Sequence, residues 1–166
     1  GKKKYAEVED EMKKAVAPMH EICEHLLDDI KRDSESFDLY MQALTLPKET
    51  EEEKAARTKA MQDGLKAAIA VPLSVAKRAY EVMPYAEVMV TKGNKTAVTD
   101  ALVATMMART AVLGALFNVK INLESIKDEA FVEETAKEAA VIEKNALAYE
   151  KKILAQADVS KSAVEE

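Results

Sequence analysis

The sequence predicts an all-α fold, an up-and-down bundle of long helices. Glycine and proline contribute only four residues each to the 166, about 5% of the chain where roughly 12% is usual. Apolar residues recur every three or four positions, which is the period of a helix. The turns of a β-sandwich or barrel depend on glycine and proline, so a many-stranded fold is not expected. We place one domain at residues 1–157 and expect residues 158–166 to fray.

Charge and cysteine content exclude two further classes of protein. Thirty acidic and twenty-four basic residues give a net charge of −6, with both signs interspersed. Duplex nucleic acid is bound by concentrated Lys and Arg, so no nucleic-acid partner is expected. The single cysteine, Cys23, cannot form an internal disulfide, and we expect a cytoplasmic protein.

The first helix is predicted from Tyr5 to about Ile30, because its apolar residues follow steps of three and four. Pro18 lies inside it and is expected to kink it. A second, short helix is predicted to begin with Asp33 or Ser34 as its cap and to end at Leu46-Pro47. Cys23 lies on the apolar face of the first helix, where a small core residue is the expected role.

A capping box formed by Thr50 and Glu53 predicts the start of a long helix. Pro72 and Pro84 are expected to interrupt this helix. Gly93 is predicted to stop it in the left-handed conformation that glycine adopts readily.

The next segment is the least polar of the chain, because Arg109 is the only ionised side chain between Asp100 and Lys120. The pattern predicts a helix buried on every side at the centre of the bundle. A membrane span is the competing interpretation, and Arg109, Thr105 and Thr110 weaken it. We expect no membrane partner, and we expect Arg109 to pair with a carboxylate of another helix or chain. A last amphipathic helix is predicted from Asp128 to about Ala157.

Two asparagines, Asn118 and Asn122, lie one turn apart near the end of the apolar helix. Burying an amide costs about 1–3 kcal/mol unless it is hydrogen-bonded. The pair therefore indicates either a helix–helix hydrogen-bond network or contact with a polar ligand. His20 and His25 are five residues apart, which does not suit two metal ligands on one helical face. No metal site is expected.

Asp100 and the loop before it form a third group of candidate residues. Asp100 has an ordinary interpretation as an N-cap or first-turn acid. The loop Gly93-Asn94-Lys95-Thr96 could bring backbone donors and a cation to an anionic group. The spacing alone does not decide between these roles.

Several ordered blocks of sequence together carry a resemblance to a known family. KGN-x3-VTD at residues 92–100 is followed by FNVKIN-L-x2-IKDEAF at residues 117–131. GKKKY at the start, the segment 33–40, LPKETEEEKAAR at 46–57 and VPLSVA at 71–76 precede them. In this order and spacing the blocks resemble the formimidoyltetrahydrofolate cyclodeaminase / methenyltetrahydrofolate cyclohydrolase family over nearly the whole chain.

The resemblance implies an all-helical homodimer that acts on one-carbon units carried by tetrahydrofolate. The cyclodeaminase reaction closes 5-formimidoyltetrahydrofolate to 5,10-methenyltetrahydrofolate and releases ammonia, and we take it as the main hypothesis. The alternative is the cyclohydrolase reaction, in which water opens the methenyl compound to 10-formyltetrahydrofolate. Neither reaction implies a cofactor beyond the tetrahydrofolate substrate.

The candidate residues acquire roles if the resemblance holds. Asp100 becomes the acid–base group or the stabiliser of a cationic carbon. Asn118 and Asn122 would orient the pterin ring or a water, and Asp33 would accept hydrogen bonds from the pterin edge unless it only caps a helix. The folate-binding set is completed by Asn94 and by lysines for the glutamate tail: Lys92, Lys95 and Lys120.

The resemblance also implies a Gly-rich segment upstream of Gly1, which would pack beside the apolar helix. Its absence from this sequence indicates either a missing segment or a shortened protein. A hypothesis of another class therefore stays open, namely a helical dimerisation module that keeps the fold without catalysis.

Overall fold

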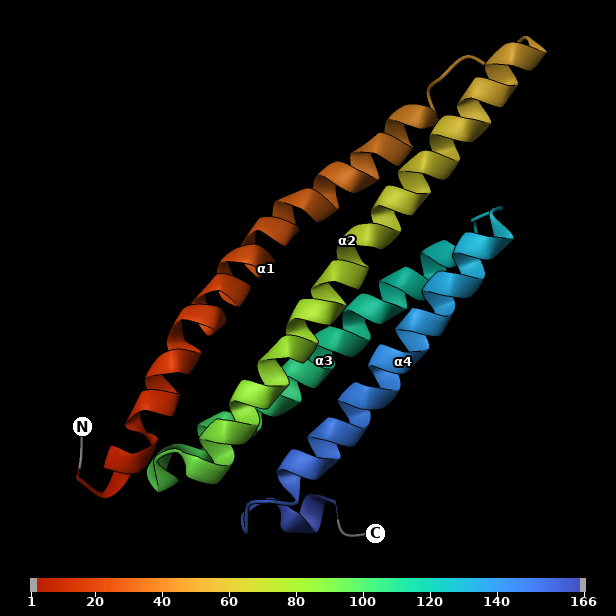
Figure 1. The fold of residues 1–166 in the computed structure, drawn as a ribbon. Helices are drawn as coiled ribbons and strands as arrows, with labels where there is room; N and C mark the ends of the chain where they lie inside the picture. Colours follow the sequence, from red (N-terminus) through yellow and green to blue (C-terminus); the bar gives the residue numbers. More distant parts are fainter. Residues whose placement is uncertain (1–2, 165–166) are drawn as a thin grey trace.

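The computed structural model describes residues 3–164, which form four long helices and no strand (Figure 1). The helices are α1 (Glu9–Ala43), α2 (Glu51–Lys92), α3 (Val98–Leu123) and α4 (Glu129–Leu154). They alternate in direction, so the predicted all-α, up-and-down arrangement is confirmed. Three short 3-10 helices, η1 (Lys3–Val8), η2 (Lys95–Ala97) and η3 (Lys161–Ala163), stand at the ends and before α3. Residues 1–2 and 165–166, at the ends of the predicted domain and tail, lie outside the described residues.

Helix α1 runs without a break through the position where we predicted a second helix to start. That prediction is wrong because both serines make their hydrogen bonds inside the helix. The Ser34 hydroxyl donates to the carbonyl of Ile30 at 3.3 Å, and that of Ser36 donates to the carbonyl of Asp33 at 2.7 Å. A serine that donates back to its own helix does not compete with the helical backbone for a cap. Asp33 is therefore an interior residue of α1, not a cap.

Cys23 corrects a second expectation for α1, because the residue is exposed rather than in the core. The buried positions of α1 lie on another stripe, which includes Ala15, Ile22 and Asp29. Since α1 has only α2 as a major neighbour, most of its surface stays in contact with solvent.

Helix α2 begins with the predicted capping box. The side chain of Thr50 accepts a hydrogen bond from the Glu53 amide at 3.1 Å, and the Glu53 carboxylate accepts one from the Thr50 amide at 3.0 Å. The helix then continues for 42 residues through Pro72 and Pro84, so the predicted interruptions are wrong. Packing on several sides outweighs the hydrogen bond that each proline removes.

Gly93 ends α2, but not in the left-handed conformation that we predicted. Its φ of −72° and ψ of −173° are extended. Glycine is favoured here by space, because a Cβ atom would lie 2.3 Å from the carbonyl oxygen of Met89. The end of α2 therefore depends on a close backbone approach.

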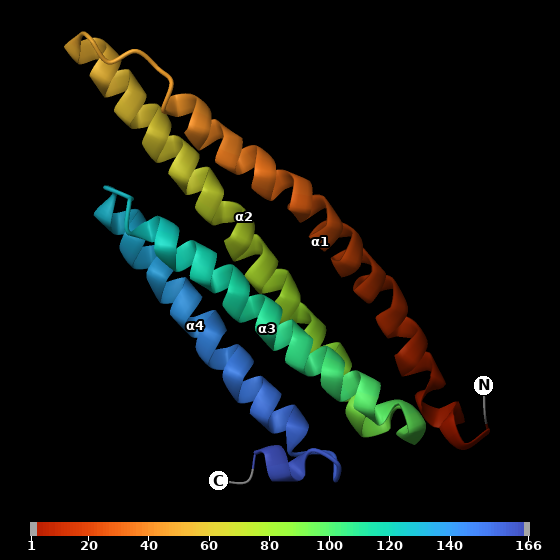
Figure 2. The same cartoon turned by 180° about the vertical axis from the view of Figure 1, so that it is seen from behind.

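The centre of the bundle is α2, which packs against each of the other three long helices. Ile69 and Met83 of α2 are fully buried, together with Val112 and Leu116 of α3 and Ile153 of α4. In Figures 1 and 2 α1 and α4 lie on opposite sides of the α2–α3 pair.

Helix α3 is buried on one side only, so the prediction of a helix buried on every side is wrong. Its outer face exposes large apolar side chains: Val103 (53%), Met107 (67%), Phe117 (59%) and Ile121 (60%). Figure 2 shows α3 in front, with no other helix over this face. Residues Lys95–Leu123 are long and apolar enough to cross a membrane, with a mean hydropathy of 1.6, and 39% of the most apolar window is buried.

Arg109 forms the predicted ion pair, with a helix of the same chain. Its Nε donates to a carboxylate oxygen of Glu150 on α4 at 2.9 Å. Lys120, near the end of α3, pairs with Glu143 of α4 at 2.7 Å. Both ion pairs lie on the side of α3 that faces α4, so Arg109 and Lys120 connect α3 to α4.

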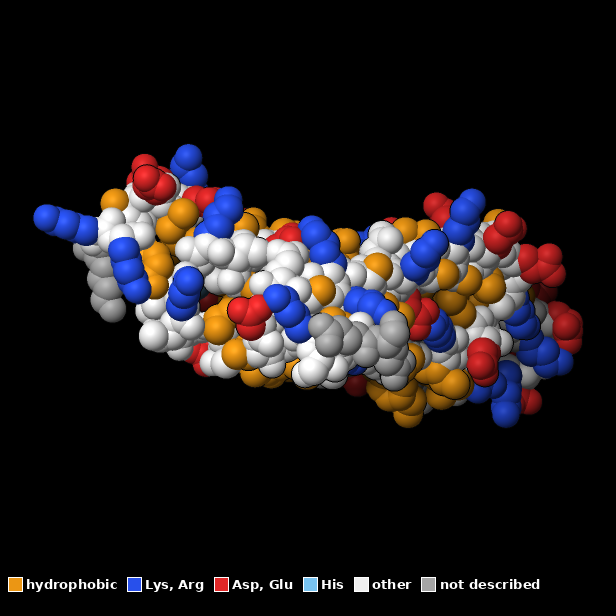
Figure 3. All heavy atoms as spheres, turned by 90° about the horizontal axis from the view of Figure 1, so that it is seen from below, with side chains coloured by type: hydrophobic (Ala, Val, Ile, Leu, Met, Phe, Trp, Pro, Cys, Tyr) orange, Lys and Arg blue, Asp and Glu red, His pale blue; other side chains and the backbone are white. Residues whose placement is uncertain are grey.

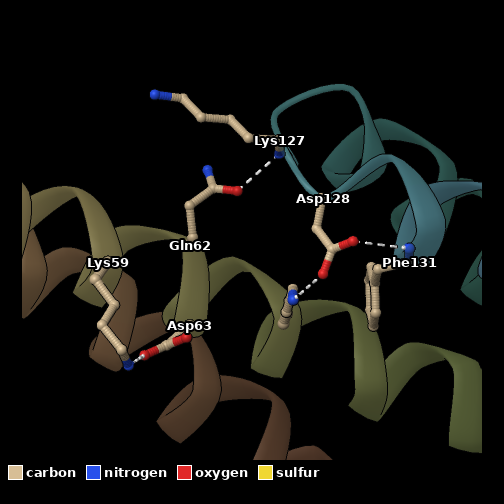
Figure 4. Close-up of polar contacts among 7 residues, drawn as sticks. Lys59, Gln62, Asp63, Lys127, Asp128 and Phe131 are labelled. Atoms are coloured by element: carbon tan, nitrogen blue, oxygen red, sulfur yellow. Dashed lines mark hydrogen bonds and ion pairs between the residues drawn. The ribbon is translucent and has the colours of Figure 1, made fainter.

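The turn between α3 and α4 is attached to α2 by a set of polar contacts (Figure 4). The Gln62 amide donates to the carbonyl of Ser125 at 2.9 Å and accepts from the amide of Lys127 at 2.7 Å. Asp128 accepts from Lys66 at 2.7 Å and from the amide of Phe131 at 3.1 Å, which caps α4. These contacts set the point at which α4 begins.

The end of the chain folds back under α4 as far as Val164. The Ser160 side chain is buried, and its hydroxyl lies 2.6 Å from the carbonyl oxygen of Leu154. The segment for which we predicted fraying forms turns and η3 up to Val164. Figure 3 views the molecule from the end that carries both termini and shows acidic and basic side chains mixed, with apolar side chains between them.

One buried carboxylate connects α1 to α2. Asp29 of α1 is 2% exposed and accepts from Arg32 and from Arg78 of α2, each at 2.5 Å. A buried charge requires such partners, because removal from water costs several kcal/mol. Asp29 therefore determines where α1 sits on α2.

A second carboxylate connects α2 to α4. Glu87 accepts from Tyr149, Lys152 and Gln156, each at 2.7 Å. Hydrogen bonds from Lys152, Gln156 and Tyr149 lower the pKa of Glu87 to about 2. Burial, together with the Glu87 carboxylate, raises the pKa of Tyr149 to about 12.

The Asp29 contact predicts a large loss of stability in Asp29→Ala. The substitution leaves Arg78 facing a partly buried site without its carboxylate, and we expect the free energy of unfolding to fall by about 2–3 kcal/mol. Urea unfolding measures it. The matched control is Asp63→Ala, which removes an exposed pair with Lys59 and should change stability by less than about 0.5 kcal/mol. Equal losses in the two variants would contradict the assignment.

The Glu87 contact predicts a pH dependence. Because its pKa is lowered from 4.5 to about 2, the carboxylate contributes stability above its unfolded pKa and loses it as the pH falls through its folded pKa. Glu87→Gln should therefore lower the melting temperature at pH 7 and flatten its decline from pH 5 to pH 2. Tyr149→Phe, which removes one donor, should give part of this effect. A Glu87→Gln profile parallel to that of the parent chain would count against it.

Candidate functional site

A cavity of about 530 Å³ lies at the end of the bundle where α1 and α3 begin and α2 ends. Its walls are mainly apolar, and its polar groups come from the start of the chain, from the loop after α2 and from the first turn of α3. The lining residues are Tyr5, Val8, Glu9, Met12, Met89, Lys92, Gly93, Asn94, Ala97, Asp100 and Ala101. An apolar cavity with a few polar groups is the usual form of a small-molecule site.

Asn94 is held in place at this cavity by two hydrogen bonds to its side-chain oxygen. Its side-chain oxygen accepts from the Tyr5 hydroxyl at 3.0 Å and from the amide of Thr96 at 3.2 Å. The amide of Lys95 in turn donates to the Tyr5 hydroxyl oxygen at 3.4 Å. The loop before α3 therefore has a fixed shape, with Tyr5 as its support.

Asp100 lies in the first turn of α3, exposed at the wall of the same cavity. Ala97 occupies the N-cap position, so the first-turn alternative holds for Asp100 and the N-cap alternative does not. The positive end of the helix dipole favours a carboxylate in the first turn. An ionised carboxylate at an apolar cavity can accept a proton or stabilise a developing positive charge.

The two lysines of this region differ in position. Lys92 lines the cavity and pairs with Glu11 at 2.8 Å, which joins the end of α2 to the start of α1. Lys95 lines a separate hollow of about 600 Å³, together with Asp158 near the end of the chain. Lys92 thus lines the same cavity as Asp100, and Lys95 does not.

A second cavity, of about 340 Å³, lies along the groove between α1 and α3, with α2 beneath it. It brings together two predicted site residues that are far apart in sequence, Asp33 of α1 and Asn118 of α3. Both are exposed, and Asn118 donates to the carbonyl of Gly114 at 3.1 Å. The remaining lining residues are Leu26, Asp29, Ile30, Pro72, Val75, Ala111 and Ala115.

Asn122 and Lys120 have partners within the chain. The Asn122 amide donates to the carbonyl of Ala68 on α2 at 3.3 Å, which is the helix–helix hydrogen bond that the sequence offered as one interpretation. Lys120 faces α4 and pairs with Glu143. Neither lines one of the two cavities described above.

The predicted site residues that line one of the two cavities therefore fall into two groups, which lie far apart within one chain. Asp100 and Asn118 lie eighteen residues apart on one helix, which is about 27 Å along its axis. Asn94 belongs with Asp100, and Asp33 belongs with Asn118.

Sequence reasoning missed the residues that support these groups. Tyr5 reaches Asn94 across 89 positions, and Asp29 reaches Arg78 across 49. Helical periodicity cannot reveal contacts of this range. The buried Asp29 breaks the apolar pattern of its helix face, and that break was the available signal.

No cluster of metal-ligating side chains occurs among residues 3–164. The two histidines lie near glutamates of their own helix: His20 is 4.0 Å from Glu24, and His25 is 3.8 Å from Glu21.

Comparison with known proteins identifies a family. The sequence profile described as formiminotransferase-cyclodeaminase matches residues 1–141. The chain is 41% identical over 138 residues to a methenyltetrahydrofolate cyclohydrolase of Methylorubrum extorquens, with 83% of this chain and 66% of the relative covered. It is 37% identical over 136 residues to a formimidoyltransferase-cyclodeaminase of Gallus gallus, with 82% of this chain and 25% of the relative covered.

A solved structure agrees with the sequence matches. The crystal structure of a formiminotetrahydrofolate cyclodeaminase from Thermotoga maritima superposes with a TM-score of 0.83 at 27% identity, covering 99% of this chain and 76% of that one. The profile match includes both cavities, and the backbone likeness extends over all four helices. The chain belongs to the formiminotransferase-cyclodeaminase family.

Proposed function

We propose that this chain converts a one-carbon unit on tetrahydrofolate, closing 5-formimidoyltetrahydrofolate to 5,10-methenyltetrahydrofolate with release of ammonia. The observation that carries the proposal is the family match over residues 1–141, which includes every polar residue of the Asp100 cavity. The chain spans 66% of the length of the bacterial relative and a quarter of the length of the avian relative.

The second candidate is the cyclohydrolase reaction, from 5,10-methenyltetrahydrofolate to 10-formyltetrahydrofolate. The relative from Methylorubrum extorquens, at 41% identity, bears this name, whereas the avian relative at 37% and the Thermotoga structure are named cyclodeaminases. The similarity thus supports both reactions.

Both reactions make the same demand on the site. In the cyclodeaminase reaction N10 attacks the formimidoyl carbon and gives up its proton, after which the carbon–nitrogen bond to the leaving group breaks and ammonia departs with added protons. In the cyclohydrolase reaction water adds to the methenyl carbon and loses one proton, and the remaining hydroxyl then loses its proton to form the formyl carbonyl as the bond to N5 breaks and N5 is protonated. Both pass through a tetrahedral carbon between two folate nitrogens, so one group that moves protons serves either. No electrons are transferred, and we propose no cofactor beyond the folate.

Asp100 is the residue that we propose for this proton transfer. Its place in the first turn of α3 favours the ionised carboxylate, which suits a base for the N10 or water proton and an electrostatic partner for a cationic carbon. The apolar walls around Met12 and Met89 suit a ring system, and Asn94 offers an amide held by Tyr5.

The other residues predicted to contact the folate differ in how accessible they are to a ligand. Asp33 and Asn118 line a cavity and are open to a ligand. Lys95 lies on the loop beside the Asp100 cavity. Lys120 and Asn122 would have to leave Glu143 and the carbonyl of Ala68 to contact folate.

The homodimer and the cytoplasmic location are also proposals. The apolar outer face of α3 supports assembly with another helix. The single cysteine is free and exposed, which suits a reducing compartment such as the cytoplasm.

Absorbance spectroscopy tests the activity, because 5,10-methenyltetrahydrofolate absorbs distinctively in the near ultraviolet. Appearance of this band from the formimidoyl compound supports the cyclodeaminase, and its decay to the formyl compound supports the cyclohydrolase. If the chain does neither and isothermal titration detects no reduced folate bound at micromolar concentration, the dimerisation module is the correct alternative.

Asp100→Asn should lower turnover by about 10²–10⁴-fold, since loss of a general acid–base group has effects of this size. The circular-dichroism spectrum should stay nearly unchanged, because the side chain is exposed. The control Glu133→Gln changes an exposed acid of α4 and should keep full turnover. Retained turnover in Asp100→Asn, with a stability loss of about 1 kcal/mol, would show that the residue serves only the helix end.

A further inference from the structure

Pro72 lies inside α2 and has no amide hydrogen to donate. In an unbroken helix the amide of residue 72 would donate to the carbonyl of residue 68, four positions earlier. The carbonyl of Ala68 therefore loses its helical partner, although Ala68 and Pro72 are both buried residues. A buried carbonyl without a donor costs free energy comparable to a lost hydrogen bond, so this carbonyl requires a donor from outside its own helix.

The donor comes from α3. The side-chain amide of Asn122, which is half-buried, donates to the carbonyl of Ala68 at 3.3 Å. Asn118, one turn earlier, instead donates to the carbonyl of Gly114 within α3. The two asparagines therefore act differently, although they lie on one side of the helix. Only Asn122 joins α3 to α2, at the carbonyl that Pro72 frees.

This hydrogen bond lies one turn beyond the cavity lined by Asp33 and Asn118, on both helices. Pro72 lines that cavity from α2, and Asn118 lines it from α3. Ala68 comes one turn before Pro72, and Asn122 comes one turn after Asn118, as expected for two antiparallel helices in a single register. One proline thus forms part of the cavity wall and also frees the carbonyl to which α3 is bound.

Apolar packing near this bond defines the register of the two helices only weakly. The fully buried side chains around it are aliphatic: Ile69 and Ala76 on α2, and Leu116 and Val119 on α3. A shift of α3 by one turn moves it about 5 Å along α2, and aliphatic side chains can repack after such a change. The same shift would leave the Ala68 carbonyl without its donor.

A buried polar contact of this kind specifies the register of packed helices. Gln62 also joins α2 to this end of the bundle, but its partners are Ser125 and Lys127 in the turn after α3. The Asn122 bond is made from within α3 itself. It therefore acts on the part of the helix that carries Asn118.

We propose that Asn122 is a positioning residue: its amide donates to the carbonyl that Pro72 frees, and this bond sets the register in which Asn118 faces the cavity. Asn122 then acts on the folate through Asn118 and does not contact it. The link to folate rests on the proposed function, whereas the register bond does not.

A double-mutant cycle with Pro72→Ala tests the hydrogen bond by urea unfolding. Asn122→Ala should raise the equilibrium constant for unfolding about ten-fold relative to Asn145→Ala, because it leaves the Ala68 carbonyl unpaired. Asn145 is an exposed residue inside α4, so this control makes the same change in helix propensity.

In the Pro72→Ala background, the new amide at position 72 donates to the Ala68 carbonyl in place of Asn122. The effect of Asn122→Ala should therefore fall below about two-fold. An equally large effect of Asn122→Ala in both backgrounds would overturn the proposal, and so would an effect no larger than that of Asn145→Ala in the parent chain.

Asn122→Asp separates the donor from the shape of the side chain. An aspartate has nearly the same size, but at pH 7 its carboxylate accepts hydrogen bonds and donates none. This variant should unfold at least as readily as Asn122→Ala. Stability equal to that of the parent chain would show that the side chain only fills space, and would overturn the proposal.

Steady-state kinetics test the positioning role at a temperature at which every variant is folded. Asn122→Ala should raise the KM for the folate substrate about five-fold, with kcat nearly unchanged, because it weakens binding and leaves Asp100 in place. Asn145→Ala should keep the KM of the parent chain. An unchanged KM in Asn122→Ala would show that the residue serves stability alone and would overturn its positioning role.

Combination with Asn118→Ala tests the route through that residue. If Asn122 acts through Asn118, adding Asn122→Ala to Asn118→Ala should change the KM by less than about two-fold. Effects that multiply would show an independent contact with the folate and would overturn this route. If the parent chain neither turns over nor binds a reduced folate, the proposed function fails, while the cycle with Pro72→Ala still decides the register bond.

Discussion

The contact between α2 and α3 is the interaction on which the rest of this structure depends. Both helices contribute small side chains to the core, among them Ala76 and Ala79 of α2 and Ala108 and Ala115 of α3, all nearly fully buried. Small residues bring the helix axes close, so that α1 and α4 can each reach α2 from the side. Both cavities lie where α1 passes over this pair, so the contact between α2 and α3 positions the candidate residues that line them.

The same contact explains why α3 has two apolar faces with different partners. One face is satisfied within the chain by α2 and α4, with Arg109 and Lys120 attached to glutamates of α4. On the opposite face the large apolar side chains are exposed, and no other described helix covers them. A helix of this composition is costly to expose to water, and a partner on the outer face removes that cost.

Polar groups connect the helices where small side chains alone would leave their register undetermined. Asp29 links α1 to α2, Glu87 links α2 to α4, and Gln62 links α2 to the turn before α4. Each joins residues at least 49 positions apart in sequence. Such long-range contacts could not be predicted from periodicity. The helix breaks expected at Ser34, Pro72 and Pro84 were wrong for a related reason, because local preferences of a few kcal/mol yield to packing along the whole helix.

The sequence by itself determined the all-α class, the capping box at Thr50, the apolar character of residues 100–120 and the family resemblance. Each of these depends on residue types at short spacing or on ordered blocks, which are properties of one chain read in order. Only the tertiary structure decided which face of α3 is covered, and that Asp100 and Asn118 lie at separate cavities. The physical reason is that a helical period assigns a side chain to a face, whereas the helices that pack around that face are set by contacts between distant segments.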